Sequence, residues 1–72
     1  MKNYVKLKQK MLEASGRSDF TNFLAELLGV SLTTAGKKLN GNAPFKQSEI
    51  VTLTLKLGLS GDDVKNIFVG SD

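Results

Sequence analysis

The sequence contains no cysteine and no histidine. Disulfides, the usual zinc ligands and the commonest general acid/base of enzymes are therefore excluded. The remaining candidates for chemistry are Asp, Glu, Lys, Ser and Tyr, and no close set of them converges on one place in 72 residues. We expect no enzyme activity, no bound metal and no cofactor.

Long hydrophobic runs are also missing. No stretch of about 18 apolar residues exists, and the N-terminal residues alternate lysine with apolar side chains, so we expect neither a membrane span nor a signal peptide. Hydrophobic residues make up 40% of the chain and charged residues 24%, which is ordinary for a folded protein. The sequence predicts a single cytoplasmic domain over residues 1–72.

Charge is distributed unevenly along the chain. Residues 1–46 hold eight Lys/Arg and three Asp/Glu, a balance of +5, whereas residues 47–72 hold two and four, a balance of −2. A basic first part can attract a phosphate backbone or an acidic protein surface. Lysines that only keep helices soluble would give the same count.

Glycines divide the chain into segments of helical length. Apolar residues recur in most of these segments at the three- and four-residue spacing of a helix face. The expected helices run from Asn3 to near Gly16, from Ser18 or Asp19 to Gly29, from Ser31 to Asn40, over 46–57, and from Ser60 to Gly70. The predicted fold is all-α, a compact five-helix bundle.

Two of these segments need comment. The segment over 46–57 also alternates apolar residues as a strand does, and we favour a helix because an unpaired strand is not stable in water. The segment after Ser31 has a thin apolar face, made of Ala35, Leu39 and the stem of Lys38.

The second and third segments together indicate a helix-turn-helix unit over about residues 18–40. Such a unit needs a small residue at the helix crossing, a glycine at the turn and an apolar residue just after it. Ala25, Gly29 and Val30 supply these three features in order.

Residues 21–41, TNFLAELLGVSLTTAGKKLNG, resemble the helix-turn-helix signature of Cro/CI-type phage regulators. Residues 38–50, KLNGNAPFKQSEI, are similar to the segment that follows the recognition helix in very short phage regulators. About residues 3–68 fit their five-helix plan, and size and pattern resemble the modulator-of-repression (Mor) antirepressors. The resemblance implies a lambda-repressor-like fold in a bacterial host cell.

The chain departs from the pattern of a sequence-specific DNA reader. Thr21 stands where this family usually has Gln, and Ala35 replaces a larger aliphatic anchor. Gly36 costs the recognition helix roughly 1 kcal/mol relative to Ala. Bidentate bonds to bases come from longer polar side chains, and only Lys37 has that reach among the outward residues. We therefore expect weak sequence discrimination.

Contacts with phosphates are better provided for, because several polar residues fall on or around the motif. For the two lysines at the end of the third segment, a solvated helix end that complements the dipole is the alternative. The residues predicted to contact DNA phosphates are Thr21, Ser31, Thr33, Lys37, Lys38, Asn40 and Lys46.

Apolar residues near the motif suggest a second kind of surface. Leu32 is expected to point outward from the first turn of the third helix, which suits a protein groove better than a base edge. Phe20 and Phe45 either join it or pack in the core. With Lys37 as a contact to an acidic surface, the predicted partner-binding residues are Phe20, Leu32, Lys37 and Phe45.

The resemblance and the residues predict a regulator of the lysis-lysogeny switch in a temperate phage. The Mor resemblance implies that the protein binds the N-terminal DNA-binding domain of the cognate CI-type repressor and blocks or alters its operator binding. DNA contact would be secondary or joint. The alternative is a self-sufficient Cro-like repressor on its own operator.

Overall fold

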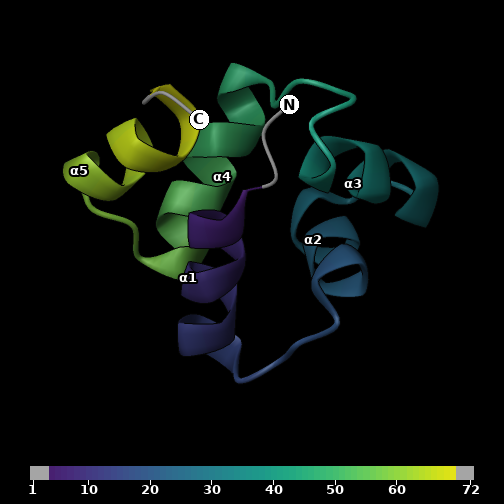
Figure 1. Ribbon diagram of the computed structural model, residues 1–72, viewed down its shortest axis with the longest axis horizontal. Helices are drawn as coiled ribbons and strands as arrows, with labels where there is room; N and C mark the ends of the chain where they lie inside the picture. The colour runs from purple at the N-terminus through teal and green to yellow at the C-terminus, as the bar shows by residue number, and fades with distance from the viewer. Residues whose placement is uncertain (1–3, 70–72) are drawn as a thin grey trace.

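The computed structural model describes residues 4–69, which form an all-α bundle (Figure 1). Its helices enclose a hydrophobic core. No strand occurs in that range. The elements are α1 (Val5–Ser15), α2 (Phe20–Leu28), α3 (Leu32–Leu39), α4 (Gln47–Leu57), α5 (Gly61–Val64) and a closing π-helix, η1 (Lys65–Val69). The predicted fold class is confirmed at the level of an all-α bundle.

The helices form two groups around α4. Helix α1 packs on α4 and on η1, whereas α2 packs on α4 and on α3, so that α3 lies at one side of the molecule (Figure 1). The core draws on every α-helix except the short α5, and it also takes residues from η1 and from the turn before α5. Its buried members are Leu7, Met11, Leu24, Ala35, Leu39, Leu53, Leu59 and Ile67.

Local sequence explains most helix ends. Helix α2 ends at Gly29, which has φ 67° and so occupies a left-handed conformation that costs glycine little. Ser31 caps α3, since its Oγ accepts a hydrogen bond from the Thr34 N–H at 3.1 Å. Ser60 and Asp63 form the predicted capping box of α5.

Segment 46–57 is a helix, as favoured, and not a strand. Helical geometry buries Leu53 and leaves Val51 and Leu55 exposed, although all three belong to the alternating pattern. The alternating apolar residues of this segment therefore do not form the buried face of a strand.

The two ends of the bundle differ from expectation. Asn3, the expected first cap, and Gly70, the expected last residue, lie outside the described residues. Tyr4 precedes α1 with φ 51° and makes no side-chain capping hydrogen bond. The fifth helix is not one α-helix, because it changes after Val64 into the π-helix η1. Ile67, within this π-helix, belongs to the core.

The core position of Leu24 gives a test of this packing. Leu24→Ala removes a fully buried side chain, and we expect it to lower the free energy of unfolding by about 2–5 kcal/mol. Leu55→Ala is the matched control, because Leu55 is 78% exposed and its loss should change stability by less than about 0.5 kcal/mol. Urea denaturation measures both, and equal losses would contradict the described core.

Candidate functional site on helix α3

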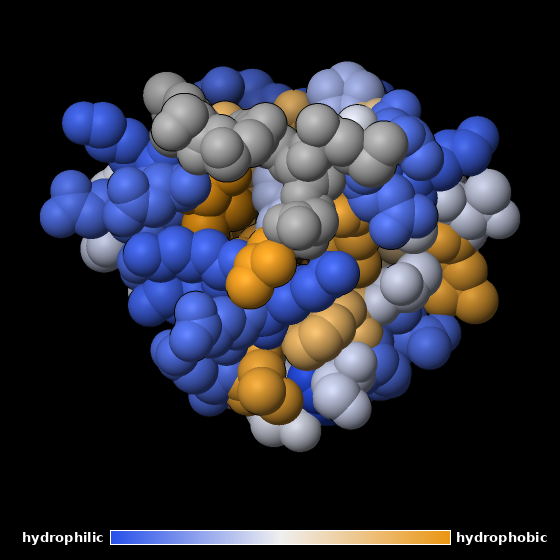
Figure 2. Space-filling model, viewed as in Figure 1, coloured by the Kyte–Doolittle hydropathy of each residue, from blue (hydrophilic) through white to orange (hydrophobic). Residues whose placement is uncertain are grey.

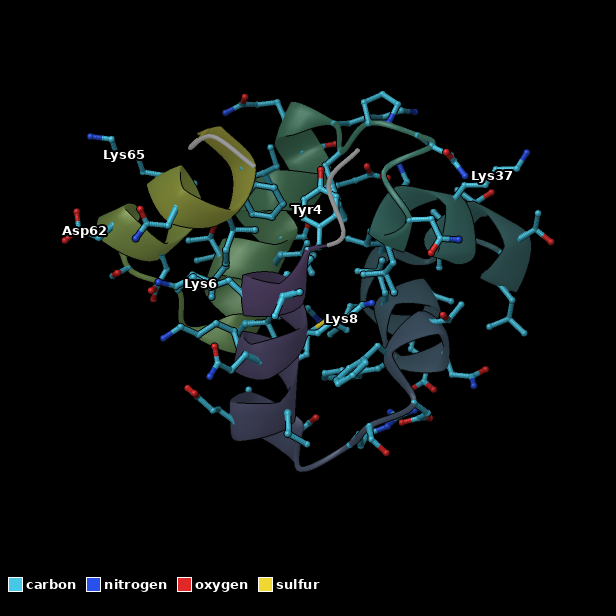
Figure 3. The ribbon with its side chains drawn as sticks, viewed as in Figure 1. Tyr4, Lys6, Lys8, Lys37, Asp62 and Lys65 are labelled. Carbon is cyan, nitrogen blue, oxygen red and sulfur yellow. The ribbon has the colours of Figure 1, made fainter. Side chains whose placement is uncertain are left out.

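Helix α3 has one buried face and one open face. Ala35, Lys38 and Leu39 are buried, as the sequence predicted. Thr33 and Lys37 are exposed on the other side, and Leu32 is exposed at the start of the helix. In Figure 3 the side chain of Lys37 extends from α3 away from the bundle.

Leu32 is the most unusual residue on the open face. It opens α3 directly after the Ser31 cap and is 55% exposed, which confirms the predicted outward direction. The face of the molecule in Figure 2 is mainly hydrophilic, with hydrophobic areas scattered among polar ones. A leucine this exposed contributes little buried surface to the fold, and it is available for contact with another molecule.

The ammonium group of Lys38 is bound within the protein, so the structure does not support its predicted contact with phosphates. Its Nζ donates hydrogen bonds of 2.8 Å to the Pro44 carbonyl and 2.8 Å to Glu49 Oε1. The Lys38 side chain is only 6% exposed and that of Glu49 12%. The thin apolar face of α3 requires the lysine stem inside, and Glu49 then binds its ammonium group within the protein.

Glu49 has a second role at the start of α4. Its Oε1 also accepts a hydrogen bond of 2.8 Å from the Lys46 N–H and thereby caps the helix. Burial raises the pKa of the carboxyl, but the hydrogen bonds from Lys38 and Lys46 and the charges of both lysines outweigh it. The net effect lowers the pKa of Glu49, so the pair is ionised at neutral pH.

The other predicted phosphate contacts are spread over the surface. Ser31, Thr33, Lys37, Asn40 and Lys46 are exposed, and Thr21 is half-buried. The hydroxyl of Ser31 is already engaged, because it accepts from Thr34 N–H and donates to Thr34 Oγ1 at 3.0 Å. The Ser31 hydroxyl therefore acts as the cap of α3.

Thr21 and Asn40 come together at an open hollow of about 310 Å³ between α1, α2 and the end of α3. Neither Lys37 nor Thr33 belongs to its lining. The residues that line it are Lys8, Ser18, Asp19, Phe20, Thr21, Asn22, Leu39 and Asn40.

Lys8 is a lining residue that the sequence analysis did not single out. Figure 3 shows it extending from α1 towards α2. The sequence placed Lys8 only off the apolar stripe of its helix, and the hollow forms when α2 and α3 pack nearby. Lys8 therefore adds a positive charge close to Thr21 and Asn40.

Asp19 also lines the hollow, and the charge of its carboxylate is balanced locally. Arg17 Nη2 lies 2.7 Å from Asp19 Oδ2 and 3.0 Å from Glu26 Oε2. Hydrogen bonds from Arg17 lower the pKa of both carboxyl groups. Arg17 also stacks on Phe23, with Cζ 4.9 Å from the ring centroid.

Phe20 and Phe45 follow the core-packing alternative that the sequence left open for them. Both are half-buried and pack against the core. The Phe45 ring centroid lies 5.1 Å from that of Tyr4 and 5.2 Å from that of Phe68 in edge-to-face contacts. Three rings from distant parts of the chain thus cover one another, and Leu32 alone among the predicted apolar anchors is exposed.

The Lys38–Glu49 pair gives a prediction for stability. Glu49→Gln leaves the buried ammonium without its counter-charge, and we expect a loss of roughly 3 kcal/mol at pH 7. Because the folded-state pKa of Glu49 is depressed, its contribution is present above the ordinary value of 4.5 and is lost as the pH falls through the folded-state value.

Urea denaturation of both proteins over a pH series from 7 downwards measures these effects. The loss from Glu49→Gln should shrink as the pH falls through the folded-state pKa of Glu49, because the wild-type carboxyl then also becomes protonated. The double variant Lys38→Met, Glu49→Gln is the control, because it removes the unpaired charge and should regain part of the stability. Stability at pH 7 that is the same for Glu49→Gln as for the unmodified protein would contradict the assigned role of the ion pair.

Two other features, a metal site and a membrane-spanning helix, are not found in the described range, residues 4–69. Within it, no group of acidic residues could hold a metal ion. None of the helices there is long and apolar enough to cross a membrane. Comparisons of the chain with protein families and with curated proteins find no match.

Proposed function

We propose that this protein is a regulator of a temperate-phage genetic switch that acts in the cytoplasm of the bacterial host. It binds the N-terminal DNA-binding domain of the cognate CI-type repressor and blocks or alters operator binding by that repressor. In this proposal α2 and α3 form a lambda-repressor-like helix-turn-helix unit in which α3 occupies the place of the recognition helix.

The exposure of Leu32 is the observation that carries this proposal. A helix that reads bases presents long polar side chains to the major groove. The open face of α3 presents a leucine, a threonine and one lysine. Leucine in a partner's apolar pocket gains free energy from burial, whereas most base edges offer it no comparable contact.

Contact with DNA is secondary or joint in this proposal. Lys37 is in none of the ion pairs of residues 4–69. Lys8 contributes positive charge at the hollow beside Asn40. Such groups bind phosphates without reading sequence. They also support the second candidate function, a Cro-like repressor that binds its own operator.

The proposal predicts that Leu32→Ala separates binding from stability. Truncation of an anchor in a partner pocket costs about 2 kcal/mol or more, so the Kd for the repressor's N-terminal domain should rise about thirtyfold. The melting temperature should hardly change, because the side chain is exposed. Calorimetric titration and a thermal melt measure the two quantities.

Val51→Ala on α4 is the matched control for this experiment, since Val51 is a similarly exposed aliphatic residue on another helix. It should leave repressor binding unchanged. If Leu32→Ala binds the repressor domain as tightly as the unmodified protein, the interface on α3 is wrong.

Binding to DNA by the isolated protein distinguishes the two candidate functions. We expect a Kd near 10⁻⁴–10⁻⁶ M on any duplex at physiological salt, as for non-specific contact. Lys37→Glu should weaken binding to either duplex or repressor, whereas Lys56→Glu, on exposed α4 surface, should affect both less. A nanomolar gel shift on one operator, about a thousandfold tighter than on random duplex, would instead establish the Cro-like repressor.

A further inference from the structure

Gly36 occupies the middle of α3, one helical turn after Leu32 and one turn before Asn40. Residues four apart lie on the same side of a helix, so Gly36 shares the side of Leu32. It is partly exposed there. Glycine inside a helix destabilises it relative to alanine, so its presence in an eight-residue helix requires a reason.

The fold itself does not supply that reason. Gly36 is not among the glycines with positive φ, so an L-amino acid can adopt its backbone conformation. A Cβ built at Gly36 would lie 3.8 Å from Thr21 Cγ2, which is an ordinary van der Waals distance. Alanine would therefore fit in the free protein and would favour the helix.

We propose that Gly36 serves partner binding. It is the position without a side chain in a protein-docking surface made by Leu32, Gly36, Lys37 and the methyl group of Thr21. The absence of a side chain lets the partner approach the α3 backbone closely beside Leu32. This inference rests on the proposed function and names the part of α3 against which the repressor packs.

Charge specifies the chemistry of the partner surface. Helix α3 carries two lysines and no acidic residue, and its buried Lys38 is neutralised by Glu49. Glu26 on the neighbouring α2 is paired with Arg17. Lys37 remains as a positive charge next to Gly36, so the complementary protein surface has an apolar pocket for Leu32 and a carboxylate for Lys37.

Two substitutions test this surface without a risk to folding. Gly36→Ala and Gly36→Gln both introduce better helix formers, so both should raise the melting temperature of the full chain. In calorimetric titration with the repressor's N-terminal domain, Gly36→Ala should raise the Kd about tenfold and Gly36→Gln further. A merely structural role for Gly36 would not combine greater stability with weaker binding.

Gly61→Ala on α5 is the matched control, because it adds the same methyl group where nothing lies within 4 Å. It should leave the Kd unchanged. If both Gly36 variants bind the repressor domain within twofold of the unmodified protein, the proposal for Gly36 is wrong while the proposed function stands. If the unmodified protein does not bind the domain at all, the proposed function fails and the Gly36 proposal fails with it.

A parallel titration with a random DNA duplex covers the other class of partner. The Gly36 variants should retain the duplex affinity of the unmodified protein, because phosphate contacts depend on the lysines. A loss of duplex binding with unchanged repressor binding would overturn the proposal and assign the surface to nucleic acid.

Discussion

The ion pair between Lys38 and Glu49 joins α3 to α4 inside the protein. Lys38 reaches from α3 to the carbonyl of Pro44 in the following loop and to the carboxylate of Glu49 on α4. Helix α3 is short, and the apolar side chains that it buries are Ala35 and Leu39. A charged group inside the bundle therefore complements the small apolar anchor and fixes the loop between the two helices.

This arrangement determines what α3 can offer to another molecule. The residues that attach α3 to the rest of the protein are buried, whereas Leu32 and Lys37 are exposed and available to another molecule. Such a helix presents few groups that discriminate between bases. One exposed leucine, one glycine and one lysine are better suited to contact with a protein partner. The lysine can also contact phosphates without reading sequence.

Local rules predicted the elements well. Ser31, Gly29 and the pair Ser60–Asp63 mark helix ends through hydrogen bonds and backbone conformations that involve only near neighbours in sequence. The exposure of Leu32 follows from its place in the first turn of α3, directly after the Ser31 cap. These signals are contained in a few consecutive residues, and the sequence alone therefore revealed them.

The errors concern contacts between distant residues. The stem of Lys38 was placed inside correctly, but its ammonium group was assigned to phosphates because its partner Glu49 is eleven residues away. Phe45 packs with Tyr4 and Phe68, which come from the two ends of the described chain. The spacing of residues in the sequence does not predict such contacts between distant segments.

The central claim is that the outer face of α3 binds the repressor protein. The most direct measurement is an NMR titration of the ¹⁵N-labelled chain with the unlabelled N-terminal domain of the repressor. The account predicts that the largest shift changes fall on residues 31–37. Saturable shift changes confined to α5 and η1, with residues 31–37 unaffected, would contradict it.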